Sequence, residues 1–197
     1  MTIPRIIGIC GNIGSGKNAI AQILKAEFGH VIRGFSDPLY RILETLNPLL
    51  KIDGIYSRYN DLVHHYGVDK VKRDCPEVRK YLRLLGTECG RDIHGQGCWV
   101  RQMAKDMGDD TLTVIQGIRF ENEVNFVKHN WLQDKNYDFR YRTGVMIHVK
   151  SDQETPPDLS HISESSIDYA AVADIHILNN GTLDELRACV IREMKRL

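Results

Sequence analysis

Apolar and polar positions divide this chain of 197 residues into alternating strand and helix segments. A short apolar run at residues 6–10 predicts a buried strand. Apolar positions at helical spacing between residues 20 and 28 predict a helix that ends at Gly29, and residues 30–35 predict a second strand. This order is typical of an α/β domain, in which ligands collect at the carboxyl ends of parallel strands.

Residues 39–110 show no convincing strand, and their pattern is helical throughout apart from interruptions at Asn47-Pro48 and Asp53-Gly54. We expect an α-helical insertion at about residues 37–110. Its clearest helix spans residues 76–91, beginning at a proline that suits the first helical turn. The apolar positions expected to form the buried stripe of this helix are Val78, Tyr81, Leu82, Leu85 and Cys89.

Three further apolar segments, residues 112–116, 145–149 and 174–178, predict the remaining strands. A helix face made by Phe120, Val124, Val127 and Trp131 follows the first of them. The last helix begins with a capping box of Thr182 and Glu185. The sequence therefore predicts one domain over residues 1–197, with a parallel sheet of about five strands flanked by helices. A long excursion at about residues 150–173, which has no Arg or Lys from residue 151 onward, is expected to be a lid over phosphates.

The stretch between the first strand and the first helix carries the clearest chemistry. Gly11, Gly14, Gly16 and Lys17 have the spacing of a P-loop, and the strand before and the helix after them are the required context. Glycines let successive N–H groups turn toward an anion, lysine adds a point charge, and the helix N-terminus adds partial positive charge. The alternative is a glycine-rich turn that joins a strand to a helix without a ligand.

Two positions depart from the usual P-loop pattern. The residue after Lys17 is normally Ser or Thr, whose hydroxyl reaches Mg²⁺, but here it is Asn18, followed by Ala19. The acidic residue expected at the end of a later strand is replaced by Gln116-Gly117. We therefore expect the metal to be held through water, by Asn18 or by Asp37 at the end of the second strand.

Cationic side chains in the insertion suggest a second anion site. Arg79, Arg83, Thr87 and Arg91 step by four residues, which lays them along one helix face that can bind a phosphate. A solvated basic face is an equally good interpretation. Trp99 is a candidate for base stacking, although a core tryptophan is the commoner case. Arg119 follows a strand end, where a guanidinium can reach a transferred phosphoryl group.

Composition restricts the partners. The 26 basic and 26 acidic residues balance, so nothing indicates a binder of nucleic acid polymers or of membrane surfaces. There is no apolar run of membrane-spanning length and no signal-peptide pattern, which suggests a cytoplasmic protein. Five cysteines without paired spacing suggest reduced thiols, and the eight histidines show no zinc motif.

Several blocks together resemble the bacteriophage-type deoxynucleoside monophosphate kinases and, more distantly, dephospho-coenzyme A kinase and adenylate kinase. The specific blocks are Gly-Thr-Glu-Cys-Gly-Arg at residues 86–91 and Arg-Phe-Glu-Asn-Glu at residues 119–123. The P-loop, Phe-Ser-Asp-Pro-Leu at residues 35–39, Trp99-Val100, His-Ile-Ser-Glu at residues 161–164 and Asn-Gly-Thr-Leu at residues 180–183 extend the resemblance over nearly the whole chain.

The resemblance implies a P-loop kinase fold, ATP as phosphoryl donor, Mg²⁺, and a deoxynucleoside monophosphate (dNMP) acceptor held by the insertion. It implies a cytoplasmic location, in the host if the chain is phage-encoded, and leaves the oligomeric state open, a homodimer included. Catalytic roles fall to Lys17, Arg119 and Asp37. The expected ATP-binding residues are Gly11, Asn12, Ile13, Gly14, Ser15, Gly16, Lys17, Asn18, Ala19 and Asn180. The expected dNMP-binding residues are Ser36, Asp37, Arg79, Arg83, Thr87, Glu88, Arg91, Trp99, Arg119, Asn122 and Glu123.

Two alternatives remain open on the sequence. One is a P-loop kinase of another small acceptor, such as dephospho-coenzyme A. The other is a nucleotide-binding regulatory module without transfer activity, which the unusual Asn18 and Gly117 favour slightly. The absence of an Asn-Lys-x-Asp guanine signature argues against a GTPase switch.

Overall fold

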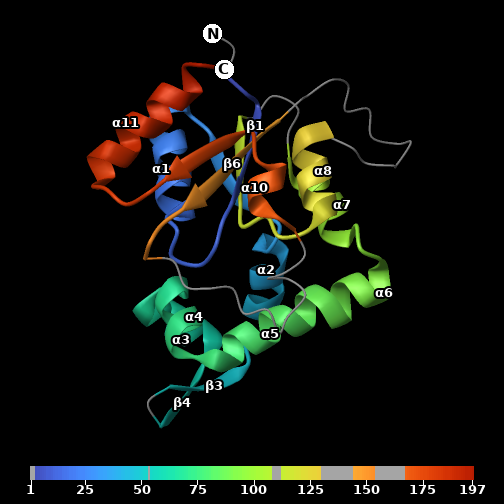
Figure 1. The fold of residues 1–197 in the computed structure, drawn as a ribbon. Helices are drawn as coiled ribbons and strands as arrows, with labels where there is room; N and C mark the ends of the chain where they lie inside the picture. Colours follow the sequence, from blue (N-terminus) through green and yellow to red (C-terminus); the bar gives the residue numbers. More distant parts are fainter. Residues whose placement is uncertain (1–2, 53, 108–111, 130–143, 154–166) are drawn as a thin grey trace. The chain divides into compact units, whose positions relative to one another are not determined.

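The computed structural model describes residues 3–52, 54–107, 112–129, 144–153 and 167–197, and the chain divides into two compact units (Figure 1). Unit 1 comprises Met1–Phe35 and Met103–Leu197, and unit 2 comprises Ser36–Gln102. Unit 2 covers most of the stretch that the sequence assigns to the insertion.

Unit 1 contains a five-stranded sheet in the order β2-β5-β1-β6-β7, and each neighbouring pair of strands is parallel. The predicted parallel α/β sheet of about five strands is thus confirmed. Its strands are β1 (Ile6–Cys10), β2 (Val31–Gly34), β5 (Thr113–Gln116), β6 (Val145–Lys150) and β7 (Ile175–Leu178). All five residues of β1 are buried, as expected for the central strand of a parallel sheet that is covered on both faces.

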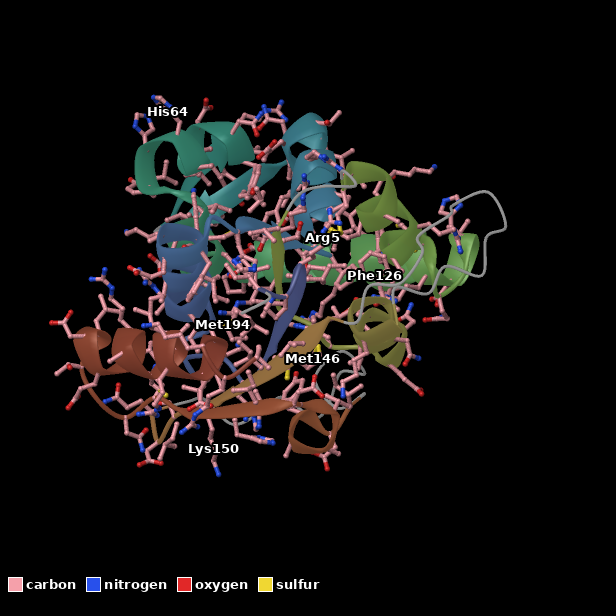
Figure 2. All side chains as sticks on the ribbon, turned by 90° about the horizontal axis from the view of Figure 1, so that it is seen from above. Arg5, His64, Phe126, Met146, Lys150 and Met194 are labelled. Atoms are coloured by element: carbon pink, nitrogen blue, oxygen red, sulfur yellow. The ribbon has the colours of Figure 1, made fainter. Side chains whose placement is uncertain are left out.

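Helices cover both faces of this sheet. On one face, α1 (Lys17–Phe28) and α11 (Leu183–Met194) pack against a core that includes Ile7, Ile9 and Val114. Met194 belongs to this core, whereas Met146 of β6 lies against Gly8 on the other face (Figure 2). That second face is covered by α8 (Glu121–His129) and the short α10 (Tyr169–Val172).

Two predicted helix ends are confirmed. Gly29 ends α1 in the left-handed conformation, with its N–H directed at the carbonyl oxygens of Leu24 and Lys25. Thr182 and Glu185 form the capping box at the start of α11. The predicted Trp131 of the α8 face lies outside the described residues.

Unit 2 is mainly helical but contains a hairpin that the sequence did not predict. The antiparallel strands β3 (Leu49–Ile52) and β4 (Ile55–Arg58) occupy a stretch expected to be helical throughout. Gly54, part of the interruption that the sequence shows, lies in the connection between these two strands and has a φ of +83°. The helices of unit 2 are α2 (Asp37–Leu46), α3 (Tyr59–Tyr66), α4 (Val68–Asp74), α5 (Pro76–Gly86) and α6 (Asp92–His94); α7 (Cys98–Asp106) returns the chain to unit 1.

The helix predicted over residues 76–91 is not one continuous α-helix. It is α-helical as α5 and continues as the π-helix η1 (Thr87–Arg91), in which the N–H of Asp92 bonds to the carbonyl of Thr87. A π-turn is wider than an α-turn, so it changes which side chains face the interior. Cys89, predicted to be buried, is exposed, whereas Val78 is fully buried.

Two expectations concern the chain as a whole, namely membrane-spanning helices and the state of the cysteines. Within the described residues, no helix combines the length and apolarity needed to cross a membrane. All five cysteines are free thiols, as the sequence suggested.

Candidate functional site

The loop between β1 and α1 adopts the conformation that its glycines permit. Gly11, Gly14 and Gly16 have φ values of +141°, +87° and +102°. A Cβ atom on Gly11 would collide with the carbonyl oxygen of Val149, and one on Gly16 with the Asn179 amide. Successive residues in such conformations present backbone N–H groups to a common anion. The loop therefore has the backbone geometry of a phosphate cradle.

Lys17 begins α1 and lies against this loop. Its Nζ donates hydrogen bonds to the carbonyl oxygens of Gly11 at 2.8 Å and of Asn12 at 2.5 Å. No acidic residue occupies the first turn of α1, so the partial positive charge of the helix N-terminus is not offset there. Backbone N–H groups, the helix terminus and the lysine thus supply positive potential at one end of the sheet.

The thiol just before the loop is not a nucleophile at neutral pH. Cys10, the last residue of β1, is fully buried, and its Sγ donates to the carbonyl of Ile147 at 3.6 Å. Burial raises the pKa of the Cys10 thiol to about 12, against the opposing effect of the Lys17 charge. Cys10 is therefore not a candidate for covalent catalysis at this edge of the sheet.

Gln116 ends the strand beside β1, at the level of Ile9. The N–H of Gly117 continues the pairing by donating to the carbonyl of Ile9 at 3.2 Å. The amide oxygen Oε1 of Gln116 is buried and has no hydrogen-bond partner among the described residues. A carboxylate usually occupies this position in P-loop enzymes. Gln116 therefore offers there an oxygen that can coordinate a metal but carries no negative charge.

The segment after β7 braces the glycine loop, a role that the sequence did not reveal. The side-chain Nδ2 of Asn179 donates to the carbonyl of Ser15 at 3.0 Å. The next residue, Asn180, expected to bind ATP, donates from Nδ2 to the Asp152 carboxylate at 2.7 Å and accepts at Oδ1 from the Asp152 N–H at 2.9 Å. The only sequence signal for Asn179 is an amide directly after a strand, which is too common to identify a site.

Arg119 lies between β5 and α8, and a buried carboxylate fixes its backbone. Glu123 Oε2 accepts from the N–H of Arg119 at 2.8 Å and from the N–H of Phe120 at 3.3 Å. Glu123 is only 3% exposed and thus caps the N-terminus of α8. Asn122 is half-buried in the first turn of the same helix. The structure therefore gives Glu123 a positioning role for Arg119.

The arginines of unit 2 do not form one uniform row. Arg79 and Arg83 are exposed on α5, and Arg79 Nε donates to the carbonyl of Lys72 at 3.2 Å. Arg91, in η1, is buried and donates from Nη1 to the carbonyl of Gln96 at 2.8 Å. The predicted four-residue spacing along one face therefore ends where the π-helix begins.

A tryptophan stabilises this π-helical junction. Trp99 Nε1 donates to the carbonyl of Gly86 at 2.8 Å, and its ring lies where a Cβ of Gly90 would be. These contacts correspond to the structural interpretation of Trp99 that the sequence left open. Thr87 is half-buried and Glu88 is exposed in the same π-helix.

Two other regions complete the candidate set. Ser36 and Asp37 are exposed at the start of α2, in unit 2. Of the expected lid, residues 154–166 lie outside the described residues, and with them the His-Ile-Ser-Glu block. The described end of that stretch carries α10, whose first N–H groups are capped by the Asp168 carboxylate. The ATP-binding candidates, Arg119, Asn122 and Glu123 thus belong to unit 1, and the remaining dNMP-binding candidates to unit 2.

A scan of the sequence against protein-family models finds no matching family, and a search of curated proteins finds no match. Solved structures with a similar fold include a shikimate kinase from Aquifex aeolicus, with 11% identity, coverage of 97% of this chain and 96% of that one, and a TM-score of 0.47. A dephospho-CoA kinase from Campylobacter jejuni has 12% identity, coverage of 99% and 98%, and a TM-score of 0.43. A shikimate kinase from Acinetobacter baumannii in complex with shikimate has 12% identity, coverage of 99% and 93%, and a TM-score of 0.47. All three of these proteins are kinases by name.

Proposed function

We propose that this protein is an ATP-dependent kinase that transfers the γ-phosphoryl group of ATP to a deoxynucleoside monophosphate, giving ADP and a deoxynucleoside diphosphate. The observation that carries the proposal is the glycine loop, with positive φ at Gly11, Gly14 and Gly16 and with Lys17 at the start of α1. A strand, a cradle of N–H groups and a lysine-bearing helix N-terminus are the parts that P-loop enzymes use to hold a nucleoside triphosphate.

In this proposal the donor is bound by unit 1. The N–H groups of residues 11–19 and the Lys17 ammonium hold the β- and γ-phosphates, and Asn180 contacts the rest of the nucleotide. Arg119 neutralises charge on the phosphoryl group as it moves from the β–γ bridging oxygen to an oxygen of the acceptor phosphate. Phosphoryl transfer depends mainly on positioning and charge neutralisation, so these groups suffice without a covalent intermediate.

The acceptor is assigned to residues of unit 2. Arg79 and Arg83 are exposed and can offer paired N–H donors to a phosphate, while Arg91 is buried and holds the turn before α7. Ser36, Asp37, Thr87 and Glu88 supply further polar contacts in the proposal. The deoxynucleotide class of acceptor rests on the resemblance of the Gly-Thr-Glu-x-Gly-Arg and Arg-Phe-x-Asn-Glu blocks.

Magnesium fits this site as a nucleotide-bound ion rather than as an ion in a protein cage. Among the described residues there is no cluster of three or more His, Cys, Asp or Glu side chains that could hold a metal. Mg²⁺ is commonly held by phosphates and waters with one or two protein oxygens, and the unpartnered Gln116 Oε1 of unit 1 is such an oxygen. The Asp37 carboxylate, expected from the sequence to act through water, belongs to unit 2. The ion would neutralise part of the phosphate charge. The side-chain amide oxygen of Asn18 is a further atom that can coordinate it.

The test is ADP production from ATP and Mg²⁺ with each deoxy- and ribonucleoside monophosphate in turn. We expect turnover with at least one deoxynucleotide, and we expect Lys17→Ala to lower it by about 10²–10³-fold or more. Absence of turnover with every deoxynucleotide would overturn the proposal. Dephospho-coenzyme A and shikimate belong in the same panel, because turnover with either one alone would identify a kinase of a different small acceptor.

A regulatory nucleotide-binding module is the second candidate. Asn18 and Gly117 replace two residues that usually organise the metal, which is the observation in its favour. Tight binding of ATP without Mg²⁺-dependent ADP formation, whatever acceptor is offered, would support this module and exclude the kinase.

A further inference from the structure

Contacts of Tyr40, Lys72 and Arg79 connect three helices of unit 2. Lys72 of α4 places its Nζ 5.6 Å from the centroid of the Tyr40 ring on α2. The carbonyl of the same lysine accepts from Nε of Arg79 on α5. These three residues, called the Tyr40 cluster below, join α2, α4 and α5, which lie together within unit 2 (Figure 1).

A buried hydroxyl lies next to this cluster. Tyr59, the first residue of α3, is completely buried, and its hydroxyl has no hydrogen-bond partner among the described residues. Burial, together with neighbouring Tyr40 and Glu44, raises the pKa of the Tyr59 hydroxyl to about 12. It therefore stays a neutral donor. An unpaired buried hydroxyl is unfavourable and needs an explanation such as a ligand or a water molecule.

The Tyr40 pair differs from the other lysine–tyrosine pairs of unit 2. Lys70 lies 4.7 Å from the Tyr66 ring but also forms an ion pair with Asp74 at 3.4 Å. Tyr66 is 51% exposed, whereas Tyr40 and Lys72 are both half-buried. No described carboxylate forms an ion pair with Lys72. Its charge is therefore not compensated by an ion pair, unlike that of Lys70, and can attract an anion.

The geometry also prepares Arg79 for an anion. The bond from Nε to the Lys72 carbonyl uses one edge of the guanidinium and restrains its plane. The terminal nitrogens keep their donors, in the fork arrangement that matches two phosphate oxygens. A cation fixed in this way, a second cation and an aromatic face together suit a ligand that combines a ring with a phosphate.

We propose that Tyr40 and Lys72, with Arg79, form the recognition site for a nucleoside monophosphate in unit 2. The base stacks on the Tyr40 ring, displacing the Lys72 ammonium, and Lys72 and Arg79 bind the phosphate. This inference rests on the proposed kinase function for its acceptor class and adds to it the residues that select a nucleotide over a ring-free anion. Stacking on an aromatic side chain strengthens the binding of a ligand with a base over that of a ring-free anion.

The experiment measures binding of each deoxynucleoside monophosphate, of inorganic phosphate and of ATP to the full chain by calorimetry. Lys72→Gln should weaken the monophosphate at least tenfold and leave ATP within twofold. Tyr40→Leu should weaken the monophosphate by a similar factor without changing inorganic phosphate, and Tyr40→Phe should retain binding. Lys70→Gln is the matched control, because it removes the same kind of cation–ring pair from the same helix and should change neither ligand.

The outcomes separate this site from the kinase proposal. Equal monophosphate affinity in Lys72→Gln and Lys70→Gln, with unchanged unfolding midpoints, overturns the site, as does a wild-type protein that binds no nucleoside monophosphate. Phosphoryl transfer to a deoxynucleotide that is insensitive to Lys72→Gln and Tyr40→Leu removes the site but keeps the kinase. Monophosphate binding that depends on Lys72, without ADP formation, keeps the site and removes the kinase.

Discussion

The glycine loop of unit 1 and the arginine-bearing helix of unit 2 offer anion-binding groups in two different ways. The loop uses backbone N–H groups, whose directions follow from φ values that only the local sequence has to permit. The helix uses long side chains, whose directions depend on the helical register and on the packing around it. The passage from α5 to η1 exposes Arg83 but buries Arg91, although both were expected on one face. A site built from backbone is therefore more predictable than one built from side chains.

The largest expected effect concerns the side chain that the loop itself carries. Lys17→Ala should reduce kcat by about 10²–10³-fold or more, because it removes a fixed positive charge that would stabilise the phosphoryl group in the transition state. The measurement is a coupled ADP assay, with circular dichroism to show that the fold is unchanged. Lys25→Ala, at the other end of α1, is the control and should retain full activity. Retained activity in Lys17→Ala would remove the lysine from the catalytic set.

The next effect tests whether the loop depends on its backbone. Gly11→Ala should destabilise unit 1 by about 3 kcal/mol, because it combines an unfavourable φ of +141° with a collision at the Val149 carbonyl. Gly29→Ala has a similarly positive φ of +77° but nothing within 4 Å, so it should cost only about 1 kcal/mol. Urea unfolding of both variants gives the comparison. Equal losses of unfolding free energy in the two variants would show that Gly11 does not lie as close to the Val149 carbonyl as the structure indicates.

The arginines of unit 2 give a third contrast. Arg91→Met should lower the free energy of unfolding by about 2 kcal/mol, because it removes a buried charge that donates to the Gln96 carbonyl. Arg83→Met should change it by less than about 0.5 kcal/mol, since Arg83 is exposed, yet it should raise the acceptor KM. Unfolding curves and acceptor kinetics on the same preparations separate the two effects. A stability loss in Arg83→Met as large as in Arg91→Met would contradict the difference in burial.

The smallest effect is a pH dependence that belongs to unit 1. Burial lowers the pKa of the His30 imidazole, outweighing the carbonyls of Pro4 and Leu24 that face its two ring nitrogens. The folded protein then binds this proton less readily than the unfolded chain does. The free energy of unfolding should therefore fall as the pH drops below the unfolded pKa of about 6.5, by at most about 1.4 kcal/mol per pH unit.

Urea unfolding at a series of pH values between 7.5 and 5 measures this slope. His30→Asn should reduce the slope, whereas His64→Asn should not, because His64 is exposed on α3 and points outward (Figure 2). An unchanged slope in His30→Asn would assign the acid sensitivity to other groups.

Much of unit 1 could be predicted because its signals are local. A buried apolar run, glycines that require positive φ, a left-handed Gly29 and a capping box each depend on neighbouring residues, and all are present in the structure. The β3–β4 hairpin was missed because its short strands pair, among the described strands, only with each other, and because their apolar residues also fit a helical pattern. The π-helix was missed because a change of helical pitch leaves no pattern in the sequence. Asn179 was missed because its partner, Ser15, is remote in the chain.

The bond between Asn179 and Ser15 has a consequence for how the protein is made. The two residues are separated by 164 positions, so the loop acquires this brace only after β7 has been synthesised and added to the sheet edge. Contacts of such long separation form late in folding, because the chain entropy of closing the loop must first be overcome. A nascent chain that ends before β7 should therefore hold nucleotide poorly even where β1 and α1 are already formed. If the proposed function holds, nucleotide that binds only the braced loop would stabilise the completed chain over its shorter precursors during synthesis.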